Sequence, residues 1–457
     1  MVKTASRKNR KTRKQRAGRF IAKGTYGCGF YPALKCEGQT EREPGLFSKL
    51  MAKSNAEEEF KQHELLAPID PDQKYLVYPL KMCKPNIEAF NSKDPNNNIS
   101  ECKSISRKSH EKAILMYHNG GPDLSKVNLS TGEYAAFFRD FLQLFEGLKV
   151  LHDNNVAHLD IKKANIVHEL ISSEPPAYRF RYIDFGLSRN VEKKVVYDDI
   201  YDSDYVIYPY ELRFIQPQFN YYNLTVNSVK KYLNSAYSNT YFTFFYPFDQ
   251  IDEYYKKDMI DSTHKYYRES YMNLYETSQI KKEDLQKSAD IYGLGILLNS
   301  IYGLYIGHKW RNDSTILIPK ESLSYPEHIY LNKFMDINEL EESPTKQWHL
   351  RVANEISLPL YKIVKGMMAR EFDVRMKIDE ALDLYKKLVP KIEELFSKEN
   401  IEQHLSQIYT HLLPLHLRKI NTTMKNKLPS RSSSYSSRNN SNNLLYNSNS
   451  TAESYYG

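Results

Sequence analysis

The sequence predicts a mixed α+β protein with a smaller, β-rich N-terminal lobe and a larger, mainly helical C-terminal lobe. With 457 residues the chain exceeds what one core usually organises, so two lobes are expected. Residues 20–120 contain short β-like segments between turn signals, with one helical stretch near 56–66. Residues 133–152 and 288–424 carry helical patterns, which place most of the helix in the second part.

Two helical stretches are expected to be buried. In residues 133–152 the apolar residues recur at helical spacing and form one face: Phe137, Phe141, Leu144, Phe145, Leu148 and Leu151. The longest apolar run, 291–306, is interrupted by Asn299 and Ser300 and is too short to span a bilayer. We therefore expect a core helix there and no membrane partner.

The net charge of +8 comes from the N-terminus. Residues 1–19 hold nine Lys/Arg and no acid, and the rest of the chain has 55 basic against 56 acidic residues. We expect residues 1–19 to be a disordered basic arm, and leave open nucleic-acid contact or nuclear entry for it. The Ser/Asn-rich residues 425–457 predict a disordered tail.

All four cysteines, Cys28, Cys36, Cys83 and Cys102, fall in the first quarter of the chain. A chain of this size does not need disulfides for stability, so we expect reduced cysteines in an intracellular protein. A zinc site is disfavoured because no Cys-x-x-Cys pair is present. The basic N-terminus has no apolar stretch behind it, so no signal peptide is expected. The expected location is the cytoplasm, with the nucleus left open.

The segment 156–167, VAHLDIKKANIV, carries an acid, a cation and an amide at fixed spacing. Phosphoryl transfer needs a carboxylate to take or orient the proton of the attacking hydroxyl, a cation beside the moving phosphoryl group, and an amide oxygen to hold a metal. Asp160, Lys162 and Asn165 fit these three roles.

A second motif lies nineteen residues after Asn165, where Asp184 begins Asp-Phe-Gly at the end of a short strand-like segment. A carboxylate in this place suits a magnesium ion that bridges phosphates. Two chance matches in turns are the alternative, but both motifs are flanked by strands and their separation fits one site.

With both motifs in place, residues 20–389 resemble the eukaryotic-type protein kinase superfamily, once an insertion at 212–286 is set aside. The resemblance implies a bilobal protein-kinase-like fold, with an N-lobe at 20–118 and a C-lobe at 119–424. It also implies ATP between the lobes, Mg²⁺, and transfer of the γ-phosphoryl group to protein substrates.

The segment 20–30, FIAKGTYGCGF, resembles the glycine-rich loop over the ATP phosphates. Gly24 and Gly27 match its second and third glycines, whereas Ala22 replaces the first. Gly29 stands where an apolar residue normally packs on adenine, and we expect Phe30 or Leu34 to take that place.

Two lysines compete for the ATP-anchoring role. Lys35 lies only eight residues past Gly27, too few for the rest of one strand, a turn and another strand. Lys49 lies 22 residues past Gly27 in a strand-like context and is our choice, with Lys35 on the surface of the second strand. Its helix partner is expected to be Glu59, and three other acids stay open: Glu57, Glu58 and Glu64.

Residues 113–124, AILMYHNGGPDL, resemble the last N-lobe strand and the hinge. The resemblance places Leu115 beside adenine, the backbone of Met116 and His118 on its edge, and Asp123 near the ribose. Downstream, Glu211 and Arg375 resemble a structural ion pair of the C-lobe. Asp290 resembles the acid that bonds the catalytic-loop backbone.

Leu159 replaces the arginine that commonly receives an activation-loop phosphate, so we expect activity without such phosphorylation. Lys162 is typical of Ser/Thr kinases. The basic start, GTYGCGFYPALKCE, FSKL and HLDIKKANIV also resemble kinases of large nucleocytoplasmic DNA viruses. Two alternatives remain: a pseudokinase or docking scaffold, and a small-molecule kinase of related fold.

Overall fold

The structure is a computed structural model of the chain. It describes residues 19–23, 27–86, 102, 111–127, 129–192, 208–209, 211–212, 224–231, 253–271, 281–302, 347–348, 351–369 and 371–404. All of them belong to one compact unit, Met1–Leu412. The expectations for the arm up to residue 18, for Gly24 and for the tail lie outside these residues. Among the helices described, none has the length and apolar character needed to cross a membrane.

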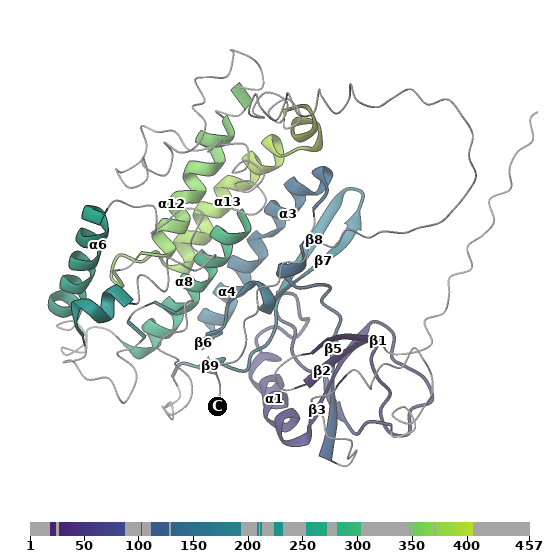
Figure 1. Ribbon diagram of the computed structural model, residues 1–457. Helices are drawn as coiled ribbons and strands as arrows, with labels where there is room; N and C mark the ends of the chain where they lie inside the picture. The colour runs from purple at the N-terminus through teal and green to yellow at the C-terminus, as the bar shows by residue number, and fades with distance from the viewer. Residues whose placement is uncertain are drawn as a thin grey trace, which may run out of the picture. The chain divides into compact units, whose positions relative to one another are not determined.

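The N-terminal region is an antiparallel sheet with one helix (Figure 1). Its strands are β1 (Arg19–Lys23), β2 (Gly27–Tyr31), β3 (Leu46–Ala52), β4 (Lys81–Cys83) and β5 (Lys112–His118). They pair in the order β1-β2-β3-β5-β4. Helix α1 (Lys53–Leu66) follows β3 directly, so a residue near the end of β3 lies close to the first turns of α1.

The two faces of this sheet have separate cores, because side chains alternate along a strand. One face buries Phe30, Leu50 and Met116 together with the cysteines. The other face buries a second cluster that includes Leu115, Tyr117 and, from the C-terminal region, Val167. The second core is therefore the place where the sheet contacts the C-terminal region.

Two disulfides, Cys28–Cys102 and Cys36–Cys83, join all four cysteines on the first face. The expectation of reduced cysteines is therefore wrong for this structure. The partners are 74 and 47 residues apart, and sequence spacing does not reveal that sheet pairing brings them together.

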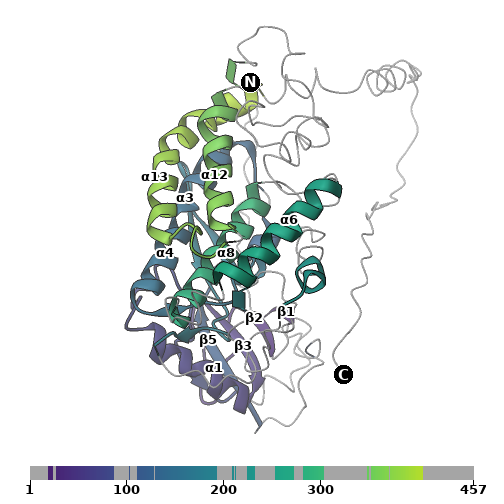
Figure 2. The same cartoon turned by 90° about the vertical axis from the view of Figure 1, so that its left-hand side faces the viewer.

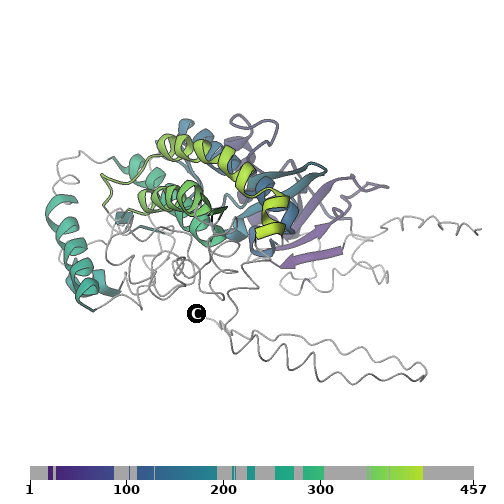
Figure 3. The same cartoon turned by 90° about the horizontal axis from the view of Figure 1, so that it is seen from above.

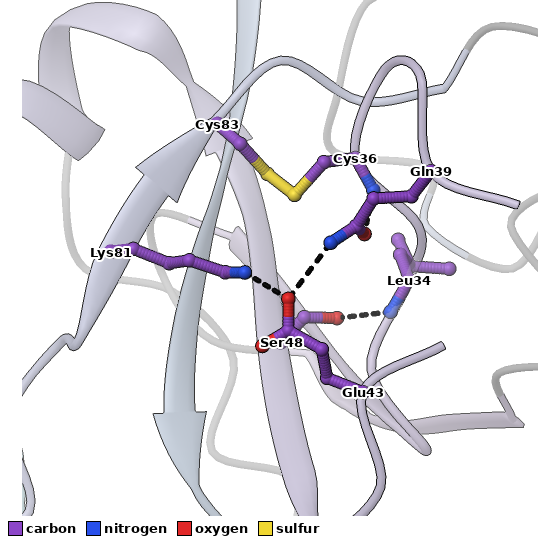
Figure 4. The surroundings of a disulfide bond; sticks show 7 residues. All are labelled: Leu34, Cys36, Gln39, Glu43, Ser48, Lys81 and Cys83. Atoms are coloured by element: carbon purple, nitrogen blue, oxygen red, sulfur yellow. Dashed lines mark hydrogen bonds and ion pairs between the residues drawn. A yellow bond between two sulfur atoms is a disulfide. The ribbon is translucent and has the colours of Figure 1, made fainter. Parts of the chain in front are cut away.

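The Cys36–Cys83 disulfide lies within a polar network in the connection from β2 to β3 (Figure 4). Gln39 accepts from Cys36 N and donates to Glu43, each at 2.8 Å, and Glu43 pairs with Lys81 of β4. The connection is thereby fixed to the far edge of the sheet.

The C-terminal region is mainly helical. Its longer helices are α3 (Tyr134–Asp140), α4 (Leu142–Asp153), α6 (Glu253–Lys265), α8 (Lys282–Tyr302), α12 (Leu358–Met367) and α13 (Ile378–Leu395). Helix α13 packs against α3, α4 and α12, and α12 also packs against α8 (Figure 2). Helix α6 lies at the outer side of this group (Figures 1 and 3). Residues Ile291 to Ile301 of α8 are buried, as predicted for a core helix.

Short elements complete this region. The strands are β6 (Val156–Ala157), β7 (Ile166–Ser173), β8 (Pro176–Tyr182) and β9 (Arg189–Asn190). The short helices are η3 (Leu124–Lys126), η4 (Thr131–Glu133), η5 (Lys163–Asn165) and the π-helical η9 (Tyr266–Tyr271) and η13 (Ala353–Ser357). Strands β7 and β8 form a hairpin, and β6 pairs with β9.

The helix expected at 133–152 is divided at Phe141, which separates α3 from α4. All six apolar residues of its predicted face are fully buried, so the prediction of a core-facing stretch is confirmed. The sequence pattern does not reveal this division, because Phe141 belongs to the apolar face and keeps a helical backbone.

A buried ion pair between Glu211 and Arg375 anchors the end of the expected activation segment. Arg375 also donates to Ser288 Oγ at 2.8 Å. Burial opposes its charge, but Glu211 raises the pKa of Arg375 above its usual value. Tyr267, in the insertion, donates to the second oxygen of Glu211 at 2.8 Å. The described part of the insertion is thus packed into the C-terminal core at this point.

Candidate active site

Asp290 of α8 holds the backbone of the loop between β6 and β7. Its carboxylate accepts from the backbone N–H groups of His158 and Leu159, both at 2.7 Å, and lies 3.2 Å from His152 Nε2. Asp290 thus bonds the catalytic-loop backbone, as predicted. Leu159 has a φ of +62°, a conformation that a bulky residue rarely adopts without such support.

Three predicted residues meet in this loop. Asn165 Nδ2 donates to Asp160 Oδ2 at 2.6 Å and to the Asp160 carbonyl at 3.0 Å. Lys162 Nζ lies 2.9 Å from the same carboxylate oxygen. The amide nitrogen of Asn165 faces Asp160, so its amide oxygen is the atom offered to a cation. A carboxylate is therefore held between an amide and an ammonium group.

Asp184 follows β8 and is brought beside this loop through the backbone. Ile183 N donates to the Asn165 carbonyl at 3.0 Å, and His158 Nε2 lies 3.2 Å from the Ile183 carbonyl. Phe185 is buried with its ring 4.8 Å from that of His158. Asp184 itself is exposed and has a φ of +61°, which aspartate tolerates better than most residues.

Asn165 and Asp184 offer an amide oxygen and a carboxylate, the hard donors that Mg²⁺ prefers. A Mg²⁺ ion usually keeps water and phosphate oxygens as its other ligands, so two protein donors suit it. Among the residues that the structure describes, no group of three or more His, Cys, Asp or Glu could hold a metal. The amide oxygen of Asn165 and the carboxylate of Asp184 fit a metal that arrives with phosphates.

Lys49 of β3 pairs with Glu59 of α1. Its Nζ lies 2.8 and 2.6 Å from the two carboxylate oxygens. Of the four glutamates considered, the structure places Glu59 against this lysine. Lys35 lies past the end of β2, in the β2–β3 connection, where it bonds the Thr40 carbonyl. The expected position of Lys35 on the second strand is therefore wrong.

A tyrosine that the sequence did not single out completes this group. The Tyr117 hydroxyl donates to Glu59 Oε1 at 2.5 Å. Tyr117 pairs with Phe47, and Leu115 with Lys49, so all four side chains lie on one face of the sheet. Because side chains alternate along a strand, the sequence could have placed Tyr117 on the same face as Leu115. Placing it beside Lys49 and Glu59 also required the register of β3 with β5.

Gly27 is required by close packing in the sheet. A Cβ there would lie 2.7 Å from the Leu50 carbonyl oxygen and 3.0 Å from the Met51 Cβ. The two residues expected to replace an apolar side chain at position 29, Phe30 and Leu34, are buried in the core on the opposite face. That expectation is wrong, because Phe30 follows Gly29 directly in the strand and its side chain therefore lies on the opposite face of the sheet.

The two expected hinge residues, Met116 and His118, both belong to β5. Met116 lies inside β5, paired with Ser48 on one side and Lys81 on the other, and its carbonyl accepts from Leu80 N at 2.7 Å. The Met116 carbonyl is therefore already engaged within the sheet, and its expected contact with an adenine edge stays a prediction. His118 ends β5 beyond the last pairing with β4.

The first hinge residues are linked to the C-terminal region. Arg181 of β8 donates to the Asn119 carbonyl at 3.0 Å and lies 3.1 Å from Glu169. Burial, with the charge of Arg181, lowers the pKa of His118. Asp123, expected near a ribose, accepts from Ser125 N at 3.0 Å and caps η3.

The structure thus combines a β-sheet N-terminal region with a helical C-terminal region. The sequence model of the family described as protein kinase domain matches residues 84–209, which include Asp160, Asn165 and Asp184.

Curated relatives match part of the chain. It is 31% identical over 84 residues to death-associated protein kinase 2 of Mus musculus and of Homo sapiens, and 33% identical over 88 residues to serine/threonine-protein kinase 17A of Oryctolagus cuniculus. Each match covers 18% of this chain and 21% of the relative, so it spans about a fifth of these proteins. The matches support the eukaryotic-type protein kinase superfamily.

Proposed function

We propose that the protein is an ATP- and Mg²⁺-dependent kinase that transfers the γ-phosphoryl group of ATP to serine or threonine hydroxyls of protein substrates. The observation that carries the proposal is the contact of Asp160 with both Lys162 and Asn165. This arrangement combines a proton acceptor, a phosphate-neutralising cation and a metal-facing amide in one loop.

In the proposed reaction the substrate hydroxyl oxygen attacks the γ-phosphorus, and the bond from that phosphorus to the bridging oxygen of ADP breaks. Asp160 orients the hydroxyl and takes its proton. Lys162 lies beside the phosphoryl group in transfer. Lys49, held by Glu59, binds phosphates of ATP, and Gly24 and Gly27 belong to the loop over them. Asn165 and Asp184 would hold Mg²⁺, which neutralises phosphate charge when bound.

The chain also has the ion pair between Glu211 and Arg375 that its resemblance to protein kinases implies for the C-lobe. The Ser/Thr preference is supported by Lys162 and by the printed name of one relative, serine/threonine-protein kinase 17A. The viral resemblance and an intracellular location rest on sequence alone and are part of the proposal. So is nucleic-acid contact by the basic arm, which deletion of residues 1–18 would test by binding assay.

A pseudokinase scaffold is the competing proposal. Ala22, Gly29 and Leu159 favour it as departures from the family pattern. The assembled Lys49–Glu59 pair and the Asp160 group favour an enzyme, because a scaffold has no need of either.

A peptide-library assay with labelled ATP and Mg²⁺ or Mn²⁺ tests the proposal. We expect label on peptides that contain serine or threonine, and none on matched peptides with alanine at the acceptor position. Transfer confined to tyrosine peptides would contradict the Ser/Thr assignment. If the protein binds ATP but transfers no phosphoryl group, either to a peptide or to itself, the scaffold is favoured.

A further inference from the structure

Gly29 and Phe47 are matched in size across two neighbouring strands. Gly29 of β2 pairs with Lys49 of β3, and Phe47 lies two residues before Lys49. All three positions therefore face the same side of the sheet. A Cβ at position 29 would lie 2.5 and 2.8 Å from Cζ and Cε2 of the Phe47 ring. The ring thus occupies the space that a side chain at position 29 would fill.

The Phe47 ring borders an apolar surface on the Lys49 side. It lies 6.2 Å from the Tyr117 ring at an interplanar angle of 57°. It packs partly buried against the cluster that contains Leu115 and, from the C-terminal region, Val167. The partial burial leaves part of the ring open on the face that also presents Lys49.

A purine base bound on this face needs a flat apolar surface on at least one side, because burying a π-face against an aromatic ring is favourable. Position 29 has no side chain to offer, and Phe30 and Leu34 point into the other core. Among the described residues that pair between β2 and β3 or between β3 and β5 on the same face as Lys49, the aromatic ones are Phe47 and Tyr117. The Tyr117 hydroxyl already bonds Glu59.

We infer that Phe47 provides the apolar surface for the adenine base, and that Gly29 is matched to it because any larger residue would displace the ring. The inference rests on the proposed function, since it assigns a residue to the nucleotide subsite of that kinase. It makes Phe47 a determinant of adenine binding and leaves the phosphate side to Lys49.

The test makes the side chain at position 47 smaller and the one at position 29 larger, separately and together, in the full-length chain. The variants are Phe47→Ala, Gly29→Val and the double variant. Met82→Ala is the matched control, because Met82 belongs to the same apolar cluster but lies on β4, at the other edge of the sheet from β2. Each protein is titrated with adenosine, which carries only the base and ribose, and with inorganic tripolyphosphate, which carries only phosphates. Thermal unfolding without ligand reports folding.

We expect Phe47→Ala to weaken adenosine binding by about 10-fold, the size of one base-stacking contact, with tripolyphosphate binding unchanged. Gly29→Val should weaken adenosine binding or lower the unfolding temperature. The double variant should recover most of either loss, because valine then fills the space that the ring left. Met82→Ala should leave the ratio of the two affinities unchanged.

Unchanged adenosine binding in Phe47→Ala would overturn the inference, and so would an equal loss for both ligands. Additive losses in the double variant would overturn the size matching. Failure of the proposed function has a different signature: the wild-type protein would then transfer no phosphoryl group, whatever the outcome of this exchange.

Discussion

The Tyr117 hydroxyl donates a 2.5 Å hydrogen bond to Glu59 Oε1, on the same carboxylate that binds Lys49. Burial, together with the nearby charge of Glu59, raises the pKa of Tyr117 well above its usual value. The hydroxyl therefore stays protonated near neutral pH and remains a donor. Tyr117 fixes the carboxylate and, through it, the lysine.

We predict that Tyr117→Phe lowers kcat/KM for ATP by about 10-fold, because the loss of one hydrogen bond to a charged group costs about 1.5–3 kcal/mol. Steady-state kinetics with varied ATP measures this effect. Tyr385→Phe is the control, since its hydroxyl donates a buried 2.7 Å bond to the Phe138 carbonyl, far from Lys49 in the chain's helical region. Equal losses in both variants would mean that Tyr117 acts only through stability.

Lys49→Met should reduce phosphoryl transfer by roughly 100-fold or more, because an oriented cation at the phosphates is lost. Lys35→Met should keep nearly full activity, since the Lys35 ammonium group bonds the Thr40 carbonyl within its own connection. Both variants are compared in the same peptide assay. The reverse ranking would show that the anchoring lysine was chosen wrongly.

The catalytic loop was predictable because its residues are close in sequence. Asp160, Lys162 and Asn165 lie within six consecutive positions, so their spacing alone brings them together. Lys49 was found by counting the residues that two strands and a turn require. The α+β division followed from the strand and helix patterns in the two parts of the chain.

Features that depend on strand register were not predictable. The engagement of the Met116 carbonyl within the sheet was not foreseen, because sequence does not say where β4 stops pairing with β5. Tyr117 and Phe47 were missed for the same reason: each has its role through a partner on another strand. The cysteine pairs required the same cross-strand information, and their composition pointed instead to free thiols.

The catalytic loop also contacts the expected activation segment without a phosphate. The Tyr208 hydroxyl donates to the Leu159 carbonyl at 2.6 Å, at the residue that replaces the usual arginine. We predict that phosphatase treatment leaves activity within about twofold, because no arginine at position 159 receives a phosphate. Tyr208→Phe, which removes the hydrogen bond to the Leu159 carbonyl, should lower kcat. A large loss after phosphatase, reversed by autophosphorylation, would contradict this account.

The disulfides predict a simple chemical result. Alkylation of the denatured but unreduced protein should modify none of the four cysteines, and alkylation after reduction should modify all four, as read by intact mass. Reduction should also lower stability by about 2–4 kcal/mol per bond lost, measured by urea unfolding. Four modified cysteines before reduction would show that the thiols are free under the conditions used.

The central claim is that Asp160 drives phosphoryl transfer, and the most direct measurement compares the wild-type protein with Asp160→Asn under MgATP and a serine peptide. Asparagine keeps the shape of the side chain but does not accept the proton, so we predict a loss of about 10²–10⁴-fold in kcat with ATP binding retained. Asp153→Asn, an exposed acid of α4, serves as the control for contaminating activity. Equal rates in all three proteins would contradict the account.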